Sequence, residues 1–150
     1  MKFLIPIILL LAACSQPAPV ARIAQTPSGY PEAVFSGISA QKLANKIAAR
    51  CVERGNLLVS QSDNLVVCEL PMSPPEIRWA KAFIGNPYAS DIKTINQDHI
   101  VRIDGKLRVQ TRLWTQLQMP YGRMKKHEIN DAENFNLGIK RLYSMGGKPV

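Results

Sequence analysis

The sequence has little of what most enzyme active sites are built from. It has only two histidines, His99 and His127, among 150 residues. Neither has a second histidine four residues away or a cysteine at metal-ligand spacing, so we expect no metal site. A Gly-x-Ser-x-Gly nucleophile elbow, a P-loop and a Gly-x-Gly-x-x-Gly loop are also absent. We therefore expect neither enzymatic activity nor a bound cofactor.

The sequence also has no apolar run long enough to cross a bilayer as a helix, which takes ~20 residues. Its apolar run Phe3 to Leu11 is much shorter and follows a single early basic residue, Lys2. A basic start, a short apolar run and a small-residue cleavage site are typical of a secretory signal peptide. We assign residues 1–13 to this signal.

The signal ends in Leu11-Ala12-Ala13-Cys14. This stretch resembles the lipobox of bacterial lipoproteins, which implies cleavage before Cys14 and acylation of its sulfur and its amine. An ordinary signal peptide that contains a cysteine is the alternative. In Gram-negative lipoproteins an aspartate after the acylated cysteine retains the protein in the inner membrane, and Ser15 stands there instead. The resemblance therefore implies a lipid anchor in the outer membrane, with the domain facing the periplasm.

The remaining two cysteines, Cys51 and Cys68, form an even pair. In an oxidising compartment such a pair is expected to be a disulfide. Closing this loop would stabilise the fold by about 3 kcal/mol in the chain-entropy estimate. Two buried free thiols are the alternative.

The chain is basic, with 19 Lys and Arg against 11 Asp and Glu and a net charge of +8. Such a balance favours anionic partners such as lipid headgroups or cell-wall polymers. A solvated basic surface is the alternative. Because only the charge points to nucleic acid, we do not expect nucleic acid to be the partner.

The mature chain divides by composition. Residues 14–36 are rich in proline and lack apolar periodicity, which indicates a lipidated tether. Residues 37–147 form one globular domain, and residues 148–150 form a frayed tail. No motif of this domain identifies a family.

Periodicity within the domain predicts an α+β fold with two layers. An antiparallel sheet of four to five strands carries helices on one face, in the order α-β-β-α-β-β-(β)-α. Helices are expected at residues 39–54, 73–84 and 130–145, and strands at 56–61, 65–70, 91–103, 107–119 and 124–129, with Asp104-Gly105 as the turn of a hairpin. Trp79 lies beside the apolar stripe of the second helix, either as a surface aromatic or as the edge of the core.

Apolar and polar residues alternate strictly over residues 107–119, which makes this stretch the clearest strand, with one buried face and one solvent-exposed (wet) face. Arginine beside tryptophan on the wet face has the composition of an interface. A solvent-facing surface with an incidental tryptophan is the alternative. The possible binding surface comprises Arg108, Arg112, Trp114, Gln116, Lys125 and Lys126.

These observations favour an interaction or structural module over an enzyme. We expect a membrane-anchored lipoprotein whose periplasmic domain binds an envelope protein complex or a cell-wall polymer. The alternative is a carrier for a lipid or small hydrophobic ligand, with a cavity between the sheet and the C-terminal helix. The oligomeric state stays open.

Overall fold

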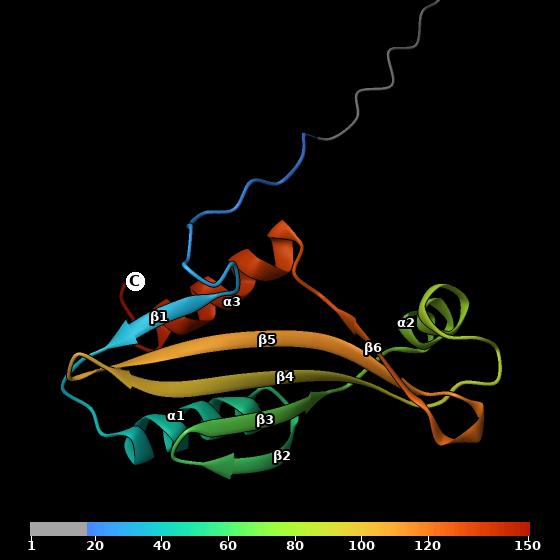
Figure 1. The fold of residues 1–150 in the computed structure, drawn as a ribbon, viewed down its shortest axis with the longest axis horizontal. Helices are drawn as coiled ribbons and strands as arrows, with labels where there is room; N and C mark the ends of the chain where they lie inside the picture. The colour runs from blue at the N-terminus through green and yellow to red at the C-terminus, as the bar shows by residue number, and fades with distance from the viewer. Residues whose placement is uncertain (1–17) are drawn as a thin grey trace, which may run out of the picture.

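The computed structural model describes residues 18–150. The predicted signal peptide, the lipobox and Cys14 lie outside the described residues. Within residues 18–150 the protein has an α+β fold built on one six-stranded antiparallel sheet (Figure 1). No helix of this part is long and apolar enough to cross a membrane. The elements are β1 (Glu32–Phe35), α1 (Ala40–Glu53), β2 (Leu57–Ser62), β3 (Leu65–Leu70), α2 (Pro74–Trp79), the π turn η1 (Ala80–Ile84), β4 (Ser90–Ile103), β5 (Lys106–Gln118), the 3-10 turn η2 (Pro120–Gly122), β6 (Met124–Glu128) and α3 (Ala132–Ser144).

The long hairpin of β4 and β5 forms the centre of the sheet. Its turn, Asp104-Gly105, has positive φ at both residues (50° and 74°), as a tight two-residue hairpin requires. β3 and then β2 extend the sheet from β4. β1 and β6 both pair with the other edge of β5, one towards each end of that strand. The predicted antiparallel α+β class is confirmed, and the sheet has six strands rather than four to five.

The first helix begins and ends as its sequence predicts. The Ser39 side chain accepts a hydrogen bond from the backbone amide of Lys42 (3.3 Å), which caps α1. Near its other end Cys51 forms a disulfide with Cys68 of β3, across a Cα–Cα distance of 6.3 Å. The predicted disulfide is therefore confirmed, and it fastens α1 to the sheet.

Two apolar cores lie on the same face of the sheet. The larger joins Leu43 of α1 and Leu142 of α3 to Val109 of β5. The smaller joins Ala80 and Ile84 of η1 to Leu117 at the far end of β5. Val109 and Leu117 are an even number of residues apart on one strand, so their side chains point to the same side. The described chain places no helix over the opposite face, which we call the helix-free face.

The predicted boundaries of the domain are wrong at both ends. β1 lies inside the stretch assigned to the tether, because its backbone pairs with β5 and its Ala33 and Phe35 are buried. Four residues are too few to show a strand pattern in the sequence. In the predicted frayed tail, Lys148 exchanges two backbone hydrogen bonds (both 2.9 Å) with Val34.

Residues 21–30, here called the N-terminal arm, lie along α3 rather than apart from the domain. The side-chain amide of Asn136 binds the start of the arm through both its oxygen and its nitrogen. Oδ1 accepts from the Ile23 amide, and Nδ2 donates to the Ala21 carbonyl (both 2.8 Å). Arg22 donates to the Asn130 carbonyl (2.6 Å) and stacks on Phe135, with its guanidinium carbon 4.4 Å from the ring centre. The predicted semi-extended tether is therefore shorter than its composition suggests.

Candidate binding surfaces

The helix-free face carries most of the predicted binding surface. Arg108, Arg112, Trp114 and Gln116 alternate along β5 and share this face. Lys126 of β6 pairs with Gln116 and places its ammonium 4.9 Å from the centre of the Trp114 ring. The indole donates to Gln116 Oε1 (3.2 Å), and Trp114 is only 9% exposed. Its own neighbours therefore cover the tryptophan, and little of it remains for a ligand.

Arg112, the next residue on this face of β5, also contacts a side chain of the same protein. Arg112 stacks on Tyr30 of the N-terminal arm, with 4.6 Å from its guanidinium carbon to the ring centre. The Tyr30 hydroxyl donates to Glu128 of β6 (2.5 Å). This hydrogen bond to a carboxylate raises the pKa of Tyr30, and burial and the Glu128 charge act in the same direction. The arm and β6 are thus linked across the edge of β5.

The two remaining predicted residues lie apart from this cluster. Arg108 lies at the other end of β5, beside a shallow hollow of about 200 Å³ that Val34 and Lys106 also line. Its buried Nε has no hydrogen-bond partner in the described chain. Lys125 pairs with Leu117, whose side chain lies in the smaller core on the opposite face. Alternation along β6 therefore separates Lys125 from Lys126.

A groove on the helix-bearing face was not predicted from the sequence. It consists of two adjoining hollows of about 190 and 310 Å³, which share Leu70, Leu113, Ile129 and Asn134. It runs between the two apolar cores, so the strands beneath it are only partly covered. The other side chains that line it include Pro71, Met72, Glu76, Trp79, Thr94 and Thr115 towards α2, and Arg54, Asn96, Thr111, Leu137 and Arg141 towards α3.

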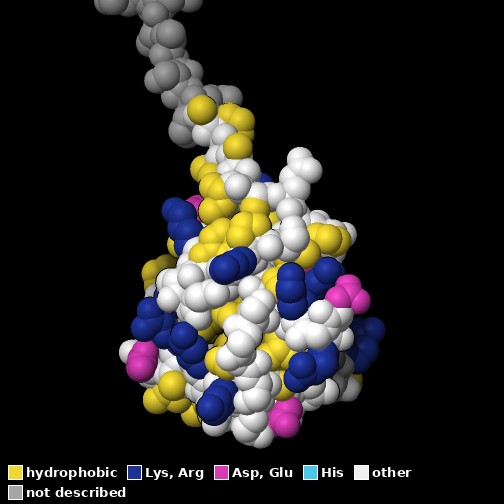
Figure 2. Space-filling model, turned by 90° about the vertical axis from the view of Figure 1, so that its left-hand side faces the viewer, with side chains coloured by type: hydrophobic (Ala, Val, Ile, Leu, Met, Phe, Trp, Pro, Cys, Tyr) yellow, Lys and Arg dark blue, Asp and Glu magenta, His cyan; other side chains and the backbone are white. Residues whose placement is uncertain are grey.

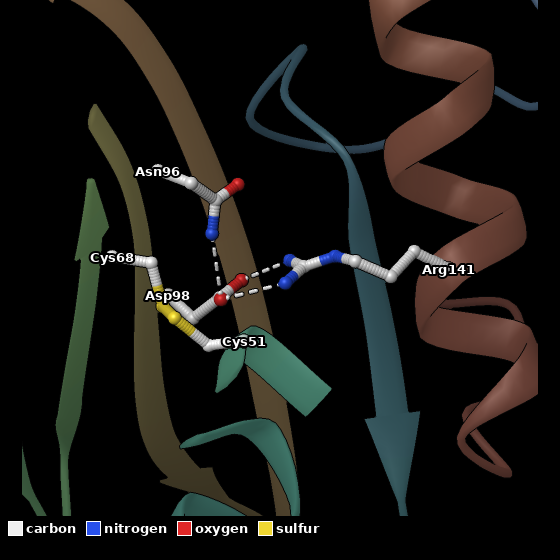
Figure 3. The surroundings of a disulfide bond; sticks show 5 residues. All are labelled: Cys51, Cys68, Asn96, Asp98 and Arg141. Carbon is white, nitrogen blue, oxygen red and sulfur yellow. Dashed lines mark hydrogen bonds and ion pairs between the residues drawn. A yellow bond between two sulfur atoms is a disulfide. The ribbon is translucent and has the colours of Figure 1, made fainter. Parts of the chain in front are cut away.

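A buried ion pair joins α3 to the sheet (Figure 3), and its Arg141 lines the α3 end of the groove. Asp98 of β4 is completely buried and pairs with Arg141 of α3 through both guanidinium nitrogens. It also accepts from Asn96 Nδ2 (2.9 Å) and from the Thr111 hydroxyl (2.5 Å), next to the disulfide. Both oxygens of the Asp98 carboxylate therefore already accept hydrogen bonds from within the domain. The ion pair fixes α3 over the sheet.

Two neighbouring residues of β4, Asp98 and His99, lie on opposite faces of the sheet. Asp98 points into the domain, whereas His99, its neighbour on β4, points to the helix-free face. Within residues 18–150, no three His, Cys, Asp or Glu side chains lie close enough together to hold a metal ion.

Comparisons with protein-family models, with curated proteins and with solved structures find no match for this chain.

Proposed function

We propose that the protein is an outer-membrane lipoprotein, anchored through Cys14, whose periplasmic domain binds an extended segment of an envelope protein. The observation that carries this proposal is the open groove between the two cores. Apolar side chains alternate there with hydrogen-bonding ones: Leu113 and Thr115 lie on β5, with Thr94 beside them on β4. A peptide needs both kinds of contact, because it presents side chains and backbone amides together.

The N-terminal arm supports a partner close to the membrane. If Cys14 is acylated, seven peptide units separate it from Ala21, the first residue held by Asn136. At roughly 3.4 Å per residue the chain then spans at most about 24 Å. The groove would therefore stay near the bilayer, within reach of membrane-proximal protein segments.

Crosslinking in living cells tests the groove. A photoreactive phenylalanine analogue replaces Leu137, which lines the groove and is exposed. The control carries the same analogue at Val101, which is exposed on the helix-free side of β4. We expect one discrete protein adduct from position 137, lost when Leu113→Arg fills the floor of the groove. Equal adducts from both positions would contradict the proposal.

The anchor is tested separately, by the mass of the protein extracted from membranes. Acylation predicts an N-terminal cysteine that carries added acyl mass. We expect Cys14→Ser to abolish this modification and to release most of the protein from the outer membrane. An unmodified Cys14 on the mature protein would contradict the lipoprotein assignment and leave the groove proposal intact.

A second candidate is a carrier for a hydrophobic ligand, and the volume of the groove is the observation that favours it. Two adjoining hollows of about 190 and 310 Å³ can together accept an acyl chain. Against this stands the polar part of the floor, because the hydroxyls of Thr94 and Thr115, which bond to each other (3.3 Å), would gain no further hydrogen bond from an acyl chain. Native mass spectrometry of the purified protein distinguishes the two: co-purified lipid favours the carrier.

A further inference from the structure

The exposed aromatic side chains of residues 18–150 all lie at one end of the molecule. Trp79 is 50% exposed, Phe83 75%, Tyr88 83% and Tyr121 100%. They belong to α2, η1, the loop before β4 and η2, which lie at the right-hand end in Figure 1. We call this the aromatic end. The other aromatic side chains of the described chain are buried or half-buried: Tyr30, Phe35, Trp114, Phe135 and Tyr143.

The backbone holds these side chains outward. The periodicity of the sequence places Phe83 in the buried stripe of the second helix, but the structure exposes it. The reason is the π turn, in which the Gly85 amide donates to the Ala80 carbonyl five residues earlier (3.0 Å). This wider turn buries Ala80 and Ile84 and leaves Phe83 outside, 5.5 Å from the Trp79 ring. π turns of this kind are frequent at functional sites.

The segments that carry the remaining two aromatic side chains pack close to the same small core. A Cβ built on Gly85 would lie 3.0 Å from the Leu117 side chain and 3.1 Å from Ala89, so the loop that carries Tyr88 is tight against the end of β5. Tyr121 follows β5 directly, in η2. The aromatic side chains therefore come from separate segments that one small core fastens together.

The charges of the aromatic end are mostly positive. Its acidic groups are Glu76, which accepts from the Ser73 amide and hydroxyl (both 2.6 Å), and Asp91, which pairs with Lys93 (3.0 Å). The opposite end also shows Lys and Arg side chains spread over its surface (Figure 2), so charge alone does not distinguish the two ends. The exposed aromatic side chains distinguish the aromatic end from the opposite end. The basic residues of the segments that form the aromatic end are Arg78, Lys81, Arg123 and Lys125.

We propose that the aromatic end binds the surface of an anionic phospholipid bilayer, as a contact separate from the anchor at Cys14. Tryptophan and tyrosine rings favour the headgroup region, where one part of the ring is apolar and another polar. Lysine and arginine around them attract anionic headgroups. This contact does not depend on lipidation, and it shares only Trp79 with the lining of the groove, since Phe83, Tyr88 and Tyr121 lie outside that lining.

Vesicle binding of the mature chain with Cys14→Ser tests the contact without the lipid anchor. The probe is a vesicle of phosphatidylethanolamine and phosphatidylglycerol, compared with phosphatidylcholine alone. In a Trp114→Phe background the chain has one tryptophan, Trp79. We expect its emission to shift to the blue on the anionic vesicles and to be quenched by brominated acyl chains. Co-sedimentation of the chain that keeps Trp114 checks that this substitution has not altered vesicle binding.

Two double variants decide whether the aromatic side chains matter. Phe83→Ser with Tyr121→Ser should weaken vesicle binding by about tenfold or more, because both rings leave water on binding. Leu57→Ser with Val59→Ser removes comparable exposed apolar groups from β2 and should leave binding unchanged. No blue shift of Trp79, or equal binding by both double variants, would overturn the proposal. So would binding that salt abolishes and the aromatic substitutions do not affect.

Discussion

The two hydrogen bonds between Asn136 and the N-terminal arm, here called the clasp, lead to the most direct prediction. Asn136→Ala removes two hydrogen bonds, to the Ile23 amide and to the Ala21 carbonyl, each 2.8 Å long. Each contributes about 0.5–1.5 kcal/mol net, so the arm loses about 1–3 kcal/mol of docking free energy. The arm buries little apolar surface at Ile23, which is exposed, so we expect it to open locally while the domain stays folded.

Hydrogen exchange followed by mass spectrometry measures this opening. Every 1.4 kcal/mol is a factor of ten in an opening equilibrium, so exchange at Ile23 should accelerate roughly 5- to 150-fold. Arg22 still holds the arm through Phe135 and Asn130, so Arg22→Ala combined with Asn136→Ala should release it further. The two effects need not be additive, because they act on one segment.

A matched control removes an asparagine from the other long helix. Asn45 of α1 is exposed, and its side chain accepts from Gln61 Nε2 (2.6 Å), far along the chain from the arm. Asn45→Ala should leave exchange at Ile23 as in the wild type. If Asn136→Ala also leaves it unchanged, or if the wild-type amide already exchanges like that of an unfolded peptide, the clasp does not hold the arm.

Three further predictions concern stability. Replacing Cys51 and Cys68 with alanine should lower the free energy of unfolding by about 3 kcal/mol, and an unchanged urea midpoint would contradict this. Asp131→Ala removes the cap of α3 and should cost about 1 kcal/mol at neutral pH. Hydrogen bonds from first-turn amides lower the pKa of Asp131, so its contribution is present above the carboxyl's unfolded pKa. It is lost as the pH falls below about 4, and a cost that stays constant down to pH 2.5 would argue against this. Arg141→Met leaves Asp98 buried without its cation and should cost about 3–5 kcal/mol by thermal unfolding; adding Asp98→Leu should recover part of that loss.

The sequence predicted best those elements whose signals are long and local. The first helix has a capping serine, an apolar stripe and a terminal glycine, and its bounds are confirmed to within one residue. The strand after Asp104-Gly105 alternates over its whole length, and the structure pairs it as a hairpin. The disulfide followed from counting cysteines rather than from any geometry.

The sequence could not predict features that depend on contacts between distant segments. β1 has four residues and becomes a strand only because β5 offers it a free edge. Asp98 alternates as its strand requires, but nothing local shows that Arg141 would reach it from α3. Trp114 does lie on the face without helices, yet Lys126 covers it from β6, so its exposure could not be inferred from strand alternation.

The shared edge of β5 also constrains the order in which the domain can fold. Glu32 of β1 pairs with Gln110, 78 residues later, and β6 completes the same edge further along. Neither strand has a partner until β5 has been synthesised and has paired with β4. Pairings across such long loops form slowly, because the entropy of closing the loop is lost before the contacts form. β1 and the N-terminal arm before it are therefore expected to dock only after β5 is available, whereas α1 and the β2–β3 hairpin have partners nearby in the chain.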